Sequence, residues 1–113
     1  LPETNNQLII EGAGGLMVPL NEDFLMIDLI KKLDAEVILV SKNYLGSINH
    51  TLMSAGILKS NGIKLSRLIF SGEQDHDSEV IISKHLQIES LHIPYFDELN
   101  SEKVTSFADK MIW

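Results

Sequence analysis

The sequence predicts an α/β fold in which helices cover both faces of a parallel sheet. Short apolar runs typical of strands alternate along the chain with longer segments that have helical periodicity. Strands separated by helices need right-handed crossovers, and such crossovers make neighbouring strands parallel. The chain has 113 residues, which is the usual size of one domain. We therefore expect a single α/β domain over residues 1–113.

The amino-terminal half is predicted to contain two strands and two helices in alternation. Residues 7–10 are a short apolar run that stops at glycines, which favours a strand followed by a loop. Residues 22–34 have one apolar side and begin after Asn21, a residue type that caps helices. Residues 36–40 are rich in β-branched side chains, as in a strand buried on both faces. Residues 46–60 have apolar side chains three and four positions apart, which predicts the second helix.

The carboxyl-terminal half repeats this alternation. Residues 66–71 predict a strand, and a helix ending near residue 86 follows an acidic stretch. Residues 90–93 predict another strand, which Pro94 stops. A last helix is expected to begin at Asn100 or Ser101 and to continue to the end of the sequence at Trp113. Its expected buried side consists of Val104, Phe107, Ala108 and Met111.

Composition excludes several classes of protein. The chain has 9 Lys and Arg against 16 Asp and Glu, a net charge of −7, which argues against a nucleic-acid-binding surface or a polybasic membrane patch. It has no cysteine, which excludes disulfides, a thiolate nucleophile and a cysteine zinc site. No apolar run approaches the roughly 18 residues of a membrane span. We expect a cytoplasmic protein that binds neither nucleic acid nor membrane.

The most informative loop follows the first predicted strand. Glu11 stands at the end of that strand, and Gly12, Gly14 and Gly15 come directly after it. A carboxylate there can hold Mg²⁺ beside substrate phosphates, and glycines let backbone amides approach a phosphate closely. The same residues also fit a tight turn with a solvated glutamate, and the spacing does not separate these alternatives. Neither a dinucleotide fingerprint nor a G-x-x-x-x-G-K-[ST] phosphate loop occurs in the chain.

Two further loops were candidates for ligand binding. Gly46 and Ser47 open a predicted helix after a strand, where free amides can bind an anion, although Ser47 or Asn49 could instead simply cap the helix. His50 has no recognisable partner in the sequence, so we interpret it as a surface or core histidine. The acidic residues 71–79 favour a solvated loop over a metal site.

Three segments together resemble one enzyme family. Residues 9–20 (IIEGAGGLMVPL), 37–40 (VILV) and 45–52 (LGSINHTL) are similar, in order and spacing, to dethiobiotin synthetase. The similarity is clear to about residue 62 and thin beyond Gly72. It implies a P-loop NTPase-like α/β fold and an ATP- and Mg²⁺-dependent ligase of biotin synthesis. That enzyme closes the ureido ring of 7,8-diaminopelargonic acid with CO₂, through a phosphorylated carbamate, and works as a homodimer with active sites at the subunit interface.

The resemblance also implies roles for particular residues. It makes Glu11 the metal ligand, and it assigns no catalytic residue to this chain. Its cofactor-binding residues would be Gly12, Ala13, Gly14 and Gly15 near phosphate and substrate, with Ser71, Ile93 and Pro94 near the adenine. Its substrate-binding residues would be Leu45, Gly46, Ser47 and Asn49, which would receive the substrate carboxylate from the neighbouring subunit. Ser71 departs from the family, which has an adenine-reading asparagine at this position.

The family's phosphate loop, its catalytic lysine and its other metal carboxylate are not found in this sequence. We therefore expect the chain to be the carboxyl-terminal portion of a longer domain whose amino-terminal half is missing, and to be inactive by itself. Two alternatives stay open. One is a non-catalytic regulatory or interaction module related to dethiobiotin synthetase, and the other is a related P-loop amidotransferase-type synthase domain.

Overall fold

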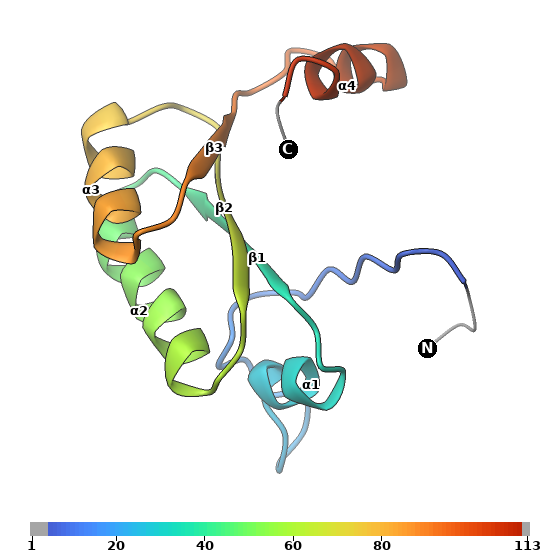
Figure 1. Ribbon diagram of the computed structural model, residues 1–113, viewed down its shortest axis with the longest axis vertical. Helices are drawn as coiled ribbons and strands as arrows, with labels where there is room; N and C mark the ends of the chain where they lie inside the picture. The colour runs from blue at the N-terminus through green and yellow to red at the C-terminus, as the bar shows by residue number, and fades with distance from the viewer. Residues whose placement is uncertain (1–4, 112–113) are drawn as a thin grey trace.

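The structure is a computed structural model that describes residues 5–111, and it contains four helices and three strands over that range (Figure 1). The elements follow one another as α1 (Met26–Lys32), β1 (Val37–Lys42), α2 (Ser47–Ser60), β2 (Leu65–Ser71), α3 (His76–Leu86), β3 (Ser90–Ile93) and α4 (Ser101–Ala108). From β1 onward strands and helices alternate, so the predicted α/β class is confirmed.

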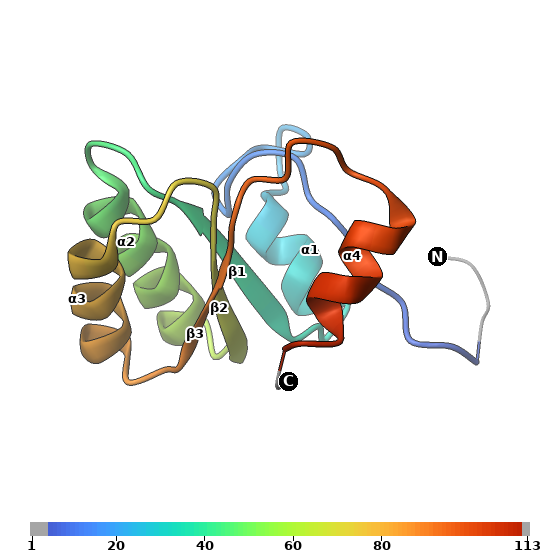
Figure 2. The same cartoon turned by 90° about the horizontal axis from the view of Figure 1, so that it is seen from above.

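The three strands form one parallel sheet with β2 in the middle. Val40 of β1 pairs with Ile69 of β2, and Phe70 of β2 pairs with His92 of β3. Helices α2 and α3 lie side by side on one face of this sheet, while α1 and α4 lie on its other side (Figure 2). The carboxyl ends of all three strands consequently meet at one edge of the sheet.

The core lies between the sheet and helices α2 and α3. Its four fully buried large side chains are Leu58, Leu68, Phe70 and Ile82. Leu39 of β1 packs against this cluster, but Ile38 and Val40 of the same strand are 50% and 61% exposed. The prediction that residues 36–40 are buried on both faces is therefore wrong, because within residues 5–111 the second face of β1 is only partly covered.

The predicted strand over residues 7–10 is also wrong. These residues have no regular structure in the described chain and all four are exposed. A strand is stable only when a neighbour accepts its backbone hydrogen bonds, and among residues 5–111 the sheet ends at β1. The following segment is instead joined to the start of α1, where the Leu16 and Val18 carbonyls each accept a hydrogen bond of 2.9 Å from residues 26–27.

Helix α1 is shorter than predicted and begins at Met26. The Asn21 side chain accepts hydrogen bonds of 2.9 Å from the amides of Asp23 and Phe24, so it stabilises a turn before the helix and does not cap it. The carboxylate of Asp28 accepts from the Leu25 amide at 2.9 Å and closes the helix start. Residues 22–25 are therefore a turn and a cap.

The elements from β1 to β3 were predicted with nearly correct bounds, and Asn100 caps α4 as expected. Helix α4 ends at Ala108 and residues 109–111 are not helical, so the prediction that this helix continues to the end of the sequence is wrong over these residues. The prediction that α4 has a buried side is wrong, because no α4 residue is buried and Val104 is 46% exposed. Its anchor is an edge-on contact between the rings of Phe96 and Phe107, whose centroids lie 5.3 Å apart. Trp113 lies outside the described residues. No helix within residues 5–111 is both long enough and apolar enough to cross a bilayer.

Candidate functional site

The parallel register gathers the ends of three strands at one edge. Lys42 pairs with Ser71, and Ser71 pairs with Ile93, so these three residues stand in a row across the sheet. Ser71 and Ile93 are half-buried, and Pro94, which follows β3, is exposed. Ser71, Ile93 and Pro94, which the sequence resemblance placed near the adenine, are thus neighbours at this edge.

Gly72 and Tyr95 form a close contact at the same edge, which sequence reasoning missed. Gly72 has a φ of +102°, and its amide donates to the Ile93 carbonyl at 2.9 Å. A Cβ on Gly72 would stand 2.8 Å from the ring of Tyr95. The Lys42 ammonium lies 5.5 Å from the centroid of that ring. A hydrogen bond with Tyr95 and electrostatic attraction to it raise the pKa of Lys42 above its usual range.

The start of α2 forms a second group of predicted residues. Gly46, the residue before the helix, has a φ of +100°. The side chains of Ser47 and Asn49 do not cap this helix, so the capping alternative is wrong. Ser47 is buried, Asn49 is exposed, and Leu45 stands fully in solvent. The Ser47 amide donates to the Tyr44 carbonyl at 2.9 Å, but the next two amides of the first turn, those of Ile48 and Asn49, have no backbone acceptor within residues 5–111. These two amides leave the anion-binding interpretation of this helix start available.

Two polar contacts position this helix start. The Ser41 and Thr51 hydroxyls, both buried, lie 2.6 Å apart and join the end of β1 to the second turn of α2. The Tyr44 hydroxyl and His50 Nδ1 are hydrogen-bonded at 2.6 Å, with ring centroids 5.8 Å apart. His50 is therefore a surface histidine held by a tyrosine, a pair that sequence reasoning did not identify.

Glu11 and the glycine loop lie in a different environment from the one predicted. Because residues 7–10 form no strand, Glu11 does not follow a strand, and residues 11–15 are exposed. A Cβ on Gly12 would lie 3.1 Å from the side chain of Met26, which places the loop against the start of α1. In the described part of the chain, no three Asp, Glu or His side chains converge on one point. Glu11 is thus a single exposed carboxylate beside glycines.

The structure reveals a buried acid in the segment that was predicted to be solvated. Residues 73–77 are exposed as expected, but Glu79 is 6% exposed and lies in α3. Its carboxylate contacts Asn43 after β1, Gln74 in the loop, and His92 in β3. We call these four residues the Glu79 network. Its members are far apart in the sequence, so no local pattern marked them.

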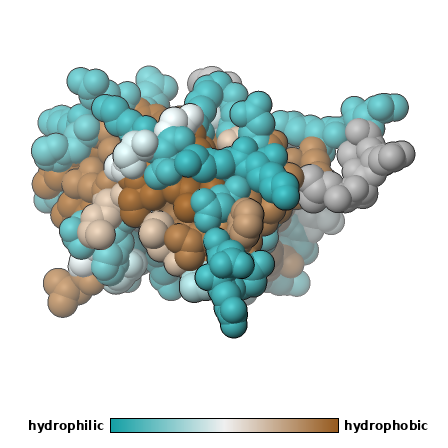
Figure 3. Space-filling view, turned by 90° about the horizontal axis from the view of Figure 1, so that it is seen from below, coloured by the Kyte–Doolittle hydropathy of each residue, from teal (hydrophilic) through white to brown (hydrophobic). Residues whose placement is uncertain are grey.

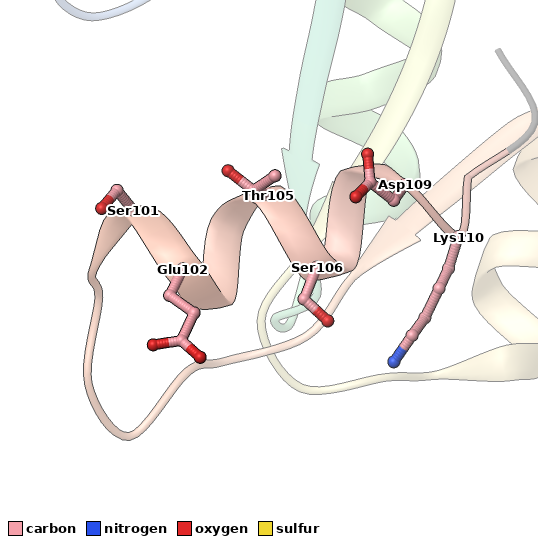
Figure 4. Close-up of a pocket in the computed structure, with 6 residues that line it drawn as sticks. All are labelled: Ser101, Glu102, Thr105, Ser106, Asp109 and Lys110. Carbon is pink, nitrogen blue, oxygen red and sulfur yellow. The ribbon is translucent and has the colours of Figure 1, made fainter.

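A shallow pocket runs along α4, away from these groups (Figure 4). Its lining residues are Ser101, Glu102, Thr105, Ser106, Asp109 and Lys110. All of them are exposed surface residues, and none is a residue that the sequence assigned to a site. We therefore place the candidate site at the carboxyl edge of the sheet and the start of α2.

A parallel α/β sheet with polar loops at its carboxyl edge is the architecture of a P-loop NTPase-like domain. The chain belongs to the family described as AAA domain, whose family model matches residues 1–103. Within that family it is similar to enzymes named ATP-dependent dethiobiotin synthetase BioD, so the resemblance found in the sequence is confirmed.

Three of these relatives show how far the similarity extends. The enzyme of Cytophaga hutchinsonii is 50% identical over 113 residues, covering 98% of this chain and 55% of the relative. That of Christiangramia forsetii is 50% identical, covering 96% of this chain and 53% of the relative. That of Campylobacter jejuni is 40% identical over 111 residues, covering 98% and 54%. The chain thus spans about half the length of the curated relatives it matches, in their carboxyl-terminal portion.

Proposed function

We propose that this chain forms part of a dethiobiotin synthetase. The complete enzyme would use ATP and Mg²⁺ to close the ureido ring of 7,8-diaminopelargonic acid with CO₂ in biotin biosynthesis. It would act in the cytoplasm as a homodimer. The observation that carries the proposal is 50% identity, over nearly the entire chain, to two enzymes of that name.

The structure supports two binding roles within this function. At the carboxyl edge of the sheet, Ser71 and Ile93 are adjacent and exposed Pro94 follows them, which suits the edge of a planar base. At the start of α2, the backbone amides of Ile48 and Asn49, which have no backbone acceptor in the described chain, suit the carboxylate of the substrate. Both positions agree with the rule that ligands of parallel sheets bind beyond the carboxyl ends of the strands.

Glu11 is the residue that we propose as a metal ligand. Mg²⁺ is commonly held by one or two carboxylates together with substrate phosphates and water, and a single exposed carboxylate next to four small residues fits that donor set. When bound, Mg²⁺ would neutralise charge on the transferring phosphoryl group. Glu11 would orient the metal ion. The small residues 12–15 would let a phosphate approach their backbone amides closely.

The test is a ring-closure assay on the intact protein. We expect dethiobiotin formation and phosphate release that depend on ATP, Mg²⁺, bicarbonate and the diamine together. Glu11→Gln should lower kcat by about 100-fold, as the loss of one electrostatic contact to a transition state does. Glu89→Gln removes an exposed acid outside the proposed site and is the matched control, with unchanged kcat. No ring closure by the unsubstituted protein would refute the proposal.

A second candidate is a non-catalytic module related to the same family. Residues 1–113 contain no G-x-x-x-x-G-K-[ST] motif, which fits such a module and a part of the enzyme equally well. Phosphoryl transfer relies on such a loop and its lysine, so we expect residues 1–113 alone to show no turnover. A phosphate-loop motif within about a hundred residues upstream of Leu1 would favour the enzyme. The intact protein's failure to hydrolyse or bind ATP would favour the module.

A further inference from the structure

Glu79 is a carboxylate that the fold buries and surrounds with donors. Its side chain is 7% exposed and lies in the first turns of α3. One carboxylate oxygen is 2.7 Å from the amide nitrogen of Asn43 and 3.0 Å from Nδ1 of His92. The other oxygen is 3.4 Å from the amide nitrogen of Gln74. These partners compensate for the burial of the carboxylate, because a buried carboxylate without partners would be strongly unfavourable.

The surroundings of His92 determine where its protons are. Its Nε2 lies 3.1 Å from the carbonyl oxygen of Gly72, which can only accept a hydrogen bond, so Nε2 carries a hydrogen. Its Nδ1 faces the carboxylate of Glu79, which also accepts when ionised. A lone pair on Nδ1 against an ionised carboxylate would repel it. One further proton must therefore lie between Nδ1 and the carboxylate, on the ring or on the acid.

The hydrogen bonds of the Glu79 network join segments at the carboxyl ends of all three strands. Asn43 follows β1 and donates both to Glu79 and to the Glu73 carbonyl, at 2.7 and 3.0 Å. His92 belongs to β3 and donates to the Gly72 carbonyl, while the Gly72 amide donates back to Ile93 at 2.9 Å. The turn 72–74 is thus held from β1, β3 and α3 simultaneously. It directly follows Ser71, one of the residues proposed to lie beside the base.

We infer that Glu79 and His92 are a positioning pair that shares one buried proton and thereby holds the turn 72–74 in the shape the nucleotide site requires. The part concerning nucleotide rests on the proposed function, whereas the shared proton does not. Removing the proton leaves two acceptors facing each other at 3.0 Å, so the contact opens and the turn is released. Substitutions that break this contact therefore lower nucleotide affinity.

Other charged groups at this edge affect the pair less directly. Lys42, at the end of β1, is engaged with Tyr95 after β3. Glu73 and Asp75 carry exposed carboxylates on the loop, and that of Asp75 is occupied by Ser78. From β1 and the loop, the groups that contact the Glu79 carboxylate are the neutral amides of Asn43 and Gln74. The proton is consequently assigned to Glu79 and His92 and not to these neighbours.

The shared proton is tested by nuclear magnetic resonance on the intact protein with labelled histidine and glutamate. At about pH 7.5 we expect the ¹⁵N shifts of His92 and the ¹³C shift of the Glu79 carboxyl to report two N–H groups, or one N–H and a protonated acid. In Glu79→Gln the ring should carry a single proton. Glu89→Gln, an exposed acid between α3 and β3, is the matched control and should leave the His92 signals unchanged. A singly protonated ring beside an ionised Glu79 overturns the inference.

The positioning role is tested by ATP binding to the intact protein at neutral pH. Glu79→Gln should weaken ATP binding about tenfold at neutral pH, the loss expected for one hydrogen bond to a charged group, and Glu89→Gln should not. His92→Gln, which can donate to Gly72 but cannot hold the proton, is the second variant and should weaken ATP binding to a similar extent. Equal affinity in all variants overturns the positioning role. No ATP binding by the unsubstituted protein overturns the proposed function and this role together, while the resonance result still decides the shared proton.

Discussion

At the scale of single residues, the carboxyl edge of the sheet depends on a glycine that no other residue could replace without strain. Gly72 combines a φ of +102° with the Tyr95 ring packed over its α-carbon. L-residues with a side chain rarely adopt such a φ. Gly15, by contrast, lacks a positive φ and has open space where a Cβ would stand. The two glycines thus have different structural roles.

We predict that Gly72→Ala lowers the free energy of unfolding by at least about 2 kcal/mol, because backbone strain adds to a clash with the Tyr95 ring. Gly15→Ala is the matched control and should change stability by less than about 0.5 kcal/mol. Urea denaturation followed by circular dichroism measures both. Similar free energies for the two variants would show that Tyr95 does not pack on Gly72.

The buried hydroxyl pair Ser41 and Thr51 leads to a second prediction. Ser41→Ala leaves the Thr51 hydroxyl buried without its partner, which should cost about 1–3 kcal/mol. Replacing both residues, as Ser41→Ala with Thr51→Val, removes both polar groups and should cost less than the sum of the single changes. Ser106→Ala, at an exposed position of α4, is the control. Strict additivity in the double-mutant cycle would contradict the direct contact.

At the scale of elements, local patterns predicted helices well and one strand wrongly. Helix α2 could be predicted because its apolar spacing and the preceding Gly46 lie within the element itself. The same local pattern at residues 7–10 was misleading, because an apolar run does not reveal whether a neighbouring strand exists to pair with it. The burial of Glu79 could not be predicted for the same reason, since its contact with His92 joins α3 to β3 across 13 residues of sequence.

Helix α3 provides a prediction on pH. Asp75 caps this helix, and hydrogen bonds from the Ser78 hydroxyl and amide lower the pKa of the Asp75 carboxyl below its ordinary value of 3.8. The ionised cap therefore stabilises the fold above pH 3.8, and this contribution is lost as the pH falls through the lower folded-state pKa. Asp75→Asn keeps a capping oxygen but cannot titrate.

We expect the unsubstituted protein to exceed Asp75→Asn in stability at neutral pH and to lose that advantage in acid. Urea midpoints measured at a series of pH values below neutrality test this, with Asp97→Asn, at an exposed acid after β3, as the control. A difference between the unsubstituted protein and Asp75→Asn that stays constant down to pH 2 would contradict the assignment of the cap.

At the scale of the whole molecule, the two faces of the sheet are unequal. One face is covered by α2 and α3 and holds the core, whereas exposed apolar side chains remain on other parts of the surface (Figure 3). Val40 of β1 and its register partner Ile69 of β2 lie on the second face. Ile69 is 7% exposed and Val40 is 61% exposed, so burial on this face changes sharply over one strand spacing.

This inequality gives the last prediction, made for the 113-residue chain. Val40→Thr should lower the free energy of unfolding by less than about 0.5 kcal/mol, because the side chain faces solvent. Ile69→Ala, on the same face one strand away, should cost about 2–5 kcal/mol because it creates a cavity. The sequence of β1, rich in β-branched residues, predicted that Val40 is buried, whereas the structure shows it 61% exposed, and denaturation of the two variants decides between these views. A cost for Val40→Thr comparable with that for Ile69→Ala would mean that the outer face of β1 is covered in solution, as the β-branched sequence of β1 predicts.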